Sequence, residues 1–156
     1  MTYTIFKDWH FSFPWIPRIY WNKDDYNWNV IFSDSCKYDH RTDDQLDWNK
    51  LVGISNHLNP RKDSLRVVWR YNKHTDLFEI GLYTEKNEDF TTVEIASVKA
   101  NEKLTINLEC YVTYALVEVN NKLFMTNFQK EYVTLRLNPY FGGNLPAPHK
   151  MKLKLW

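Results

Sequence analysis

The side chains best suited to binding a ligand are charged and phenolic groups on two neighbouring predicted strands. Arg66 and Arg70 are four positions apart in a segment of alternating polarity, so they share one strand face. A polar turn pairs this segment with the next one, and Glu79 and Tyr83 are expected on the adjoining surface. Guanidinium, carboxylate and phenol groups on one sheet face can bind a polyol or an anion. The simpler interpretation is a cross-strand charge pair that faces water.

Aromatic residues are concentrated near the start of the chain, where ten lie within the first 28 positions. Flat Trp and Tyr rings stack on sugar rings or on bases. Trp15 and Trp21 flank a proline and an arginine in an expected loop, which makes them the best exposed candidates. The alternative is that most of these rings pack an N-terminal segment onto the core, since aromatic burial is strongly favourable. The sequence leaves both interpretations open.

A third candidate region is the loop over residues 140–149, which contains two glycines and two prolines. Glycine allows backbone angles closed to other residues, and proline holds the following stretch extended. A stiff loop of this kind presents Asn144 and His149 at defined positions. The alternative is that the loop only positions the last strand.

Neither a metal site nor a catalytic motif is evident. Five aspartates lie within residues 34–47, but their spacing matches no calcium loop and two cations lie among them, so a solvated acidic face is expected. The five histidines lack zinc-ligand spacing. There is no nucleophile elbow, phosphate-binding loop or dinucleotide fingerprint, and no strand carries a hydrolytic pair of carboxylates. We therefore expect no catalytic residue, no metal and no cofactor.

Length and composition narrow the possible classes of protein. The 156 residues fit a single domain, 1–156, in which 1–25 form an aromatic-rich N-terminal segment. With 20 Lys+Arg against 19 Asp+Glu, no global field favours nucleic acid or an anionic membrane as partner. No apolar run suits a secretory signal or a transmembrane helix. A cytoplasmic location is the default expectation, with assembly into a virion or release by lysis as alternatives.

Two cysteines, Cys36 and Cys110, are too few for a disulfide framework or a CxxC metal site. Both are expected to be reduced and partly buried thiols.

Period-two alternation predicts an all-β fold. One-sided apolar patterns separated by polar turns are expected over the segments 28–32, 64–71, 77–84, 93–95, 104–108, 133–137 and 151–155. Their spacing indicates an antiparallel two-sheet β-sandwich or a barrel rather than βαβ units. The order Thr42-x-x-Gln45 followed by apolar residues and Gly53 also predicts one short helix near 43–51.

Three blocks, 48–55, 62–72 and 138–149, resemble a group of uncharacterised small β-proteins from Bacteroides-type bacteria and their phages. The resemblance spans residues 28–156 and leaves out the aromatic N-terminal stretch. Its last block is similar to the way concanavalin-A-like jelly rolls close, which implies a jelly-roll sandwich and no particular activity. Where related members show two histidines before the 62–72 block, this chain has other residues, so no role for such histidines carries over.

Together these observations predict a non-enzymatic binding module for a glycan or cell-surface ligand. The expected ligand-binding residues are Trp15, Trp21, Arg66, Arg70, Tyr83, Asn144 and His149. One alternative is a structural component of a phage or other particle, whose N-terminal arm of about 20 residues docks on a protein partner or on copies of itself. A glycan hydrolase or lyase is the third hypothesis, and it requires ionisable side chains that converge in a cleft. The oligomeric state is left open.

Overall fold

Two antiparallel β-sheets pack face to face in the computed structural model, which describes residues 1–156. In chain order the strands are β1 (Thr2–Ile5), β2 (Ser12–Phe13), β3 (Ile19–Trp21), β4 (Asp25–Phe32), β5 (Asn49–Ser55), β6 (Asp63–Asn72), β7 (Leu77–Lys86), β8 (Asp89–Val98), β9 (Lys103–Cys110), β10 (Ala115–Val119), β11 (Lys122–Thr126), β12 (Val133–Leu137) and β13 (Met151–Leu155). Two 3-10 turns, η1 (Asp34–Cys36) and η2 (Asp43–Leu46), precede β5. The expected all-β, two-sheet architecture is confirmed.

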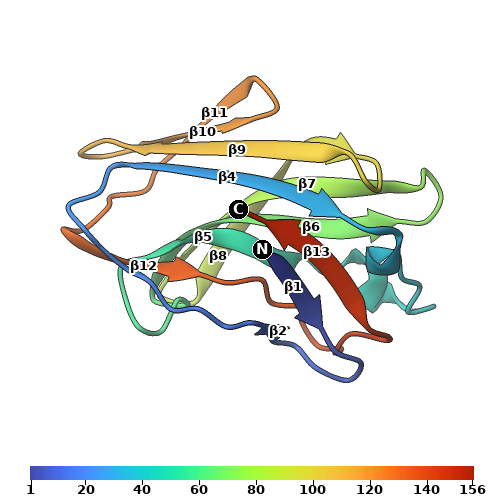
Figure 1. The fold of residues 1–156 in the computed structure, drawn as a ribbon. Coiled ribbons are helices and arrows are strands. Elements are labelled where there is room, and N and C mark those ends of the chain that lie inside the picture. The colour runs from blue at the N-terminus through green and yellow to red at the C-terminus, as the bar shows by residue number, and fades with distance from the viewer.

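One sheet has seven strands in the order β11-β10-β9-β4-β13-β1-β2, and the other has six in the order β3-β12-β5-β6-β7-β8. Figure 1 shows β9, β4 and β13 in front, with β5, β6 and β7 behind them. The C-terminal strand β13 pairs with both β1 and β4 in the middle of the larger sheet. The structure contains no helix with the length and hydrophobicity of a membrane span.

The predicted hairpins form with the expected turn chemistry. The β6–β7 hairpin places Arg66 opposite Tyr83 and Arg70 opposite Glu79, as the alternation indicated. Asn120 and Asn121 connect β10 to β11 with φ angles of 46° and 65°, which asparagine tolerates better than most residues.

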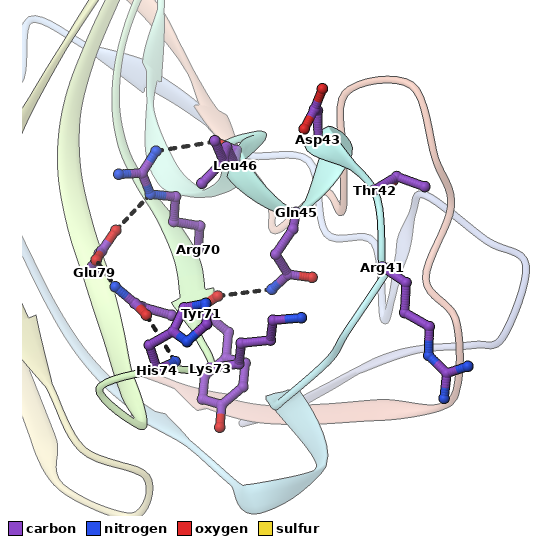
Figure 2. Close-up of a pocket in the computed structure, with 11 residues that line it drawn as sticks. Arg41, Thr42, Asp43, Gln45, Leu46, Arg70, Tyr71, Lys73, His74 and Glu79 are labelled. Carbon is purple, nitrogen blue, oxygen red and sulfur yellow. Dashed lines mark hydrogen bonds and ion pairs between the residues drawn. The ribbon is translucent and has the colours of Figure 1, made fainter.

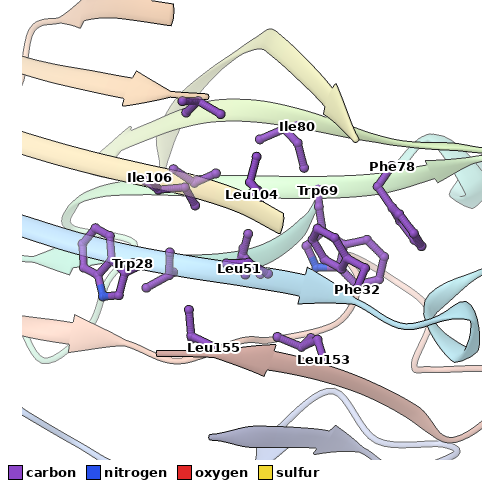
Figure 3. Close-up of a cluster of buried hydrophobic side chains, with 14 of the residues drawn as sticks. Trp28, Phe32, Leu51, Trp69, Phe78, Ile80, Leu104, Ile106, Leu153 and Leu155 are labelled. Carbon is purple, nitrogen blue, oxygen red and sulfur yellow. The ribbon is translucent and has the colours of Figure 1, made fainter. Parts of the chain in front are cut away.

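The core lies between the sheets and is rich in aromatic rings. Phe32 on β4 stacks on Phe78 at 4.6 Å between ring centroids, and Trp69 on β6 packs against both. Figure 3 shows these rings at one end of the core and Trp28 at the other. Burying each of these side chains contributes about 1.5–3 kcal/mol to folding.

The helix predicted near 43–51 is wrong. Only one 3-10 turn, η2, forms there, and the chain becomes strand β5 at Asn49. Thr42 makes no capping hydrogen bond to the turn, and the Gln45 side chain bonds to the backbone of His40 and Tyr71 instead. Gly53, expected as a helix terminator, lies in the middle of β5. Pairing with β6 and β12 on either side outweighs the local helix signals.

Strand β12 faces the opposite way to the prediction. The alternation of Val133, Leu135 and Leu137 indicated an apolar inner face, but Thr134 is the fully buried residue and Arg136 lies on its side of the strand. Phenol groups inside the sandwich supply the polar partners that this orientation needs. The Thr134 hydroxyl hydrogen-bonds to Tyr26, and Arg136 donates to the hydroxyl of Tyr3.

The N-terminal segment is part of both sheets. Strand β1 pairs with β13 and β2, and β3 pairs with β12. The projecting N-terminal arm of the assembly hypothesis is therefore absent. Each of the two interpretations of the aromatic residues holds for some of them. Tyr3, Tyr26 and Trp28 are buried in the core, whereas Trp15 and Trp21 are 64% and 68% exposed.

Both cysteines are free and buried, as expected. Burial raises the pKa of the Cys36 thiol to about 12 and that of Cys110 to about 12.

Candidate ligand-binding face

The outer face of the six-stranded sheet carries an unusual number of buried polar side chains. The inward positions of β6 and β7 are filled by core residues, so the alternate positions point away from the core. Three cross-strand pairs on this face carry polar side chains: Ser64 with Glu85, Arg66 with Tyr83, and Arg70 with Glu79.

Arg66 is nearly buried on this face, with 8% of its surface exposed, and among the charged residues there only Glu85, at 6%, is less exposed. Its Nε donates to the Ser64 hydroxyl at 3.3 Å, and this is its only hydrogen bond within the protein. No carboxylate lies within ion-pair distance of its guanidinium. Burial lowers the pKa of Arg66, partly offset by Glu85, but an arginine remains charged at physiological pH. The structure thus holds a charged group with most of its donors unused.

Tyr83 and Glu85 complete the surroundings of Arg66 on β7. Both are nearly buried, and they are neighbours on the outer face of the same strand. Burial, and then the charge of Glu85, raise the pKa of Tyr83 well above its ordinary value. The phenol therefore stays protonated and serves as a donor. Glu85 also forms an ion pair with the exposed Arg61, whose Nε lies 3.6 Å from Glu85 Oε1.

Lys50 on β5 brings a second cation to the same place. Its Nζ lies 5.1 Å from the centroid of the Tyr83 ring and donates to the Trp48 carbonyl at 3.1 Å. Burial lowers the pKa of Lys50, and the charge of Arg66 lowers it further. We call Lys50, Arg66, Tyr83 and Glu85 the central cluster. It holds two cations and one carboxylate.

Arg70 has a different environment at the far end of the ladder. Its Nε donates to Glu79 at 2.6 Å, its Nη1 donates to the Leu46 carbonyl, and its Nη2 lies 3.5 Å from Glu94. Figure 2 shows this pairing at the side of a cavity of about 510 Å³ between η2 and the β6–β7 turn. The predicted cross-strand charge pair is therefore present, and it uses the donors of Arg70 internally.

Trp48 covers the sheet between Arg70 and the central cluster. A Cβ added to Gly81 would lie only 3.1 Å from the Trp48 ring, so the missing side chain lets the indole rest on the strand. The guanidinium of Arg70 lies over this indole, with Cζ 4.3 Å from the ring centroid.

The seven predicted ligand-binding residues are not brought together in one place. Arg66, Arg70 and Tyr83 share the outer face, and Trp21 lies on its edge strand β3, three strands from β6. The remaining three lie in loops.

Trp15 lies in the exposed connection between β2 and β3. Asn144 hydrogen-bonds to Asp44 and Asp47 and so ties the C-terminal loop to η2. The His149 ring bonds to the carbonyl of Ser35 in η1.

Sequence reasoning missed Lys50, Trp48 and Glu85. The helix predicted over 43–51 hid the strand periodicity that places Lys50 on the outer face. Gly81 was the usable signal for Trp48, because a glycine inside a strand often marks a close approach. The strand predicted over 77–84 ends before Glu85, but β7 continues to Lys86.

The acidic segment 34–47 forms ion pairs with lysines. Asp34 lies 3.3 Å from Lys37, and Asp39 lies 3.0 Å from Lys73. No three His, Cys, Asp or Glu side chains gather in a way that could hold a metal ion.

Comparison with solved structures places this geometry in a known fold. An alginate lyase superposes with a TM-score of 0.66 at 8% identity, covering 99% of this chain and 71% of that one. A Saccharomyces cerevisiae protein of unknown function gives 0.59 at 9% identity, covering 99% and 86%. A Bacteroides ovatus GH16 protein of a mixed-linkage glucan system, in complex with product, gives 0.57 at 7% identity, covering 99% and 80%.

The fold is a concanavalin-A-like jelly roll. This confirms the fold that the closing block of the sequence implied. No protein-family model and no curated protein matches the sequence. At identities this low the likeness concerns the fold and carries no activity with it.

Proposed function

We propose that the chain is a non-enzymatic module that binds an acidic polysaccharide on the outer face of its six-stranded sheet. The observation that carries this proposal is the nearly buried guanidinium of Arg66, which has no carboxylate partner within the protein. A guanidinium presents five donors in a fork that fits a carboxylate with two parallel hydrogen bonds. A uronate or sulfate group on the polysaccharide would complete its hydrogen bonding.

The charge balance favours an anion over a neutral sugar. Lys50 and Arg66 are opposed in the central cluster by Glu85 alone, and that carboxylate also pairs with Arg61. Complementary charge increases both the rate and the specificity of binding. The Tyr83 hydroxyl and the Ser64 hydroxyl provide further hydrogen-bonding groups for ring hydroxyls.

An apolar surface lies beside the central cluster on the same face. Leu135 and Leu137 on β12 take the outward positions there, followed by Trp21 on β3. The exposed Trp21 ring offers a flat surface on which the apolar side of a sugar can stack. A bound chain crossing the strands would contact cations at one end and this surface at the other.

The arrangement of carboxylates favours binding over hydrolysis. Glycoside hydrolysis uses two carboxyl groups about 5–9.5 Å apart. Glu79 and Glu85 are six residues apart on β7, a distance of about 20 Å along a strand. Glu79 and Glu94 lie closer together, but both pair with Arg70. The carboxylate beside the protonated Tyr83 is Glu85, which is paired with Arg61.

The alginate lyase and glucan-system neighbours support a carbohydrate ligand through shared fold alone. The proposal is tested by calorimetric titration of the full chain with alginate oligosaccharides and with a neutral gluco-oligosaccharide. The alginate fragments should bind, and more weakly as salt increases. Arg66→Met should lower the affinity at least about tenfold, because a charge-assisted hydrogen-bond pair is lost.

Two further variants make the titration decisive. Trp21→Ala should also weaken binding without loss of fold, since the ring is exposed. Arg136→Met, which alters a cation on the other side of the sheet, should bind alginate as the wild type does. Equal binding of the neutral oligosaccharide, or an Arg66→Met variant with unchanged affinity, would overturn the proposal. Formation of unsaturated uronate product during incubation would show a lyase instead.

A second candidate function, assembly with a protein partner, rests on a different observation. The segment from Trp9 to Trp21 exposes more than half of the surface of several large side chains, a concentration that commonly marks an interaction site. These are Trp9, Phe11, Phe13, Trp15, Ile19 and Trp21. Concentration-dependent sedimentation that disappears in a Phe11→Ser, Phe13→Ser variant would favour this role, and monomeric behaviour at all concentrations would count against self-assembly.

A further inference from the structure

A second cavity lies on the opposite side of the six-stranded sheet from the central cluster. It opens between the sheets beside β3, β12 and β4 and has a volume of about 410 Å³, within the range of small-molecule sites. Residues from both sheets line it, among them Tyr3, Arg18, Lys23, Tyr26, Trp28 and Arg136.

The polar side chains of this cavity are all cationic or neutral. Arg18, Lys23 and Arg136 line it, and none of the three forms an ion pair within the protein. No Asp or Glu side chain is among the lining residues. Asp24, the carboxylate next to Lys23 in sequence, is held by Lys130 at 3.0 Å. The cavity therefore gathers three positive charges without a protein side chain that neutralises them.

Arg136 is the least satisfied of these groups. It lies on the inward side of β12, where a sandwich ordinarily places an apolar residue. Its Nη2 donates to the Tyr3 hydroxyl at 3.3 Å, and its buried Nε has no hydrogen-bond partner. Arg136 as a whole is only half-buried, but a buried donor without an acceptor is costly. An anion in the cavity would relieve that cost.

The other walls are aromatic. Tyr26 stacks on Trp28 at 5.7 Å between centroids with the rings nearly parallel, and Tyr20 meets Tyr26 edge to face. Lys23 lies over this group, with Nζ 5.6 Å from the Tyr26 centroid. Flat apolar walls beside cations suit a ligand that has a planar apolar body and one acidic group.

We propose that this cavity is a binding site for a small aromatic anion, with Arg136 as the residue that contacts its acidic group. The site is separate from the central cluster, since the sheet itself lies between Arg136 and Arg66. It does not depend on the proposed polysaccharide-binding function.

The test uses two fluorescent probes that share an aromatic body. Anilinonaphthalene sulfonate carries an acidic group, whereas phenylnaphthylamine does not. The folded full chain should bind the sulfonate saturably with one site and the neutral amine at least about tenfold more weakly. Arg136→Met should lower the affinity for the sulfonate at least about tenfold, with thermal unfolding confirming that the variant is folded.

Two control variants separate this site from other sources of probe binding. Lys103→Met and Lys122→Met, both exposed on the larger sheet, should bind the sulfonate as the wild type does. Unchanged binding in Arg136→Met, or equal binding of the neutral amine, would overturn the proposal. If Arg136→Met does not fold, Lys23→Met replaces it, and unchanged affinity there would have the same meaning.

Discussion

Two glycines in the six-stranded sheet differ sharply in what surrounds them. A Cβ at Gly53 would lie 2.2 Å from the backbone oxygen of Leu65 and 2.7 Å from the Cα of Arg66. A Cβ at Gly81 would meet only side chains, at 3.0 Å from Val68 and 3.1 Å from Trp48. Backbone atoms in a paired strand cannot move aside, whereas an indole and an isopropyl group can shift by a few tenths of an ångström.

Alanine substitution should therefore separate the two positions. Gly81→Ala should lower the free energy of unfolding by about 1–3 kcal/mol, as overpacking ordinarily does. Gly53→Ala should cost more than about 4 kcal/mol or prevent folding, because the β5–β6 pairing must open. Urea denaturation of both variants measures the difference. Similar losses for the two would show that the β5–β6 contact is looser than the structure indicates.

At the same scale, the sequence located some residues of the central cluster and missed others. The alternation on β6 and β7 was enough to place Arg66 beside Tyr83. Lys50 contacts Tyr83 from a third strand, β5. The sequence order of a helix cap, Thr42-x-x-Gln45, led to the prediction of a helix at that position. A single chain carries no signal for a contact between strands that are not joined by a hairpin.

At the scale of elements, the β6–β7 ladder includes an ion pair that makes stability depend on pH. Burial alone would raise the pKa of Glu79, but hydrogen bonds from Asn72 and Arg70 lower it overall from its ordinary value of 4.5. A carboxyl whose folded pKa is lowered stabilises the fold above its unfolded pKa. That contribution is lost as the pH falls through the folded pKa.

The Glu79→Gln variant should accordingly have a lower free energy of unfolding than the wild type at about pH 7. The difference between the two proteins should shrink at about pH 3. Urea denaturation of the variant and the wild type at the two pH values measures this difference. Glu94→Gln is the matched control, because its carboxylate is half exposed and lies 3.5 Å from Arg70, and it should change stability little at either pH. A Glu79→Gln difference that stays constant with pH would contradict the assignment.

Strand β12 shows why element orientation is harder to predict than element type. Its apolar residues occupy one face, yet that face turns away from the core. Tyr3 and Tyr26 are distant from β12 in sequence. On the inner side, the Tyr26 hydroxyl hydrogen-bonds to Thr134 and the Tyr3 hydroxyl accepts a hydrogen bond from Arg136. The outward leucines in turn extend the apolar surface beside the central cluster.

At the scale of the whole molecule, the two thiols report on opening of the sandwich. Cys36 is fully buried in η1 and Cys110 lies at the end of β9, each with a pKa raised to about 12 by burial. The thiolate is the reactive form, so both deprotonation and access are blocked in the folded chain.

Thiol reagents should therefore react with the native protein about 100-fold or more slowly than with free cysteine. The rate should rise with urea, and two thiols should react after unfolding. The Cys36→Ala and Cys110→Ala variants show which thiol gives which reaction rate. Cys110 should react faster, since it lies at a strand end. Rapid labelling without denaturant would show that the ends of the sandwich open readily.

The sequence alone determined the fold class, the hairpins and the facing of β6 and β7, because period-two alternation and polar turns act over a few residues. Only the tertiary structure decided which charges are buried and which lack partners. Arg66 and Arg70 look alike in sequence, yet one pairs with Glu79 and the other has no carboxylate partner. The alternation in the sequence predicts that Arg136 lies on the outer side of its strand. In the structure it lines a cavity instead. Burial and pairing depend on chain segments that meet only when both sheets have formed.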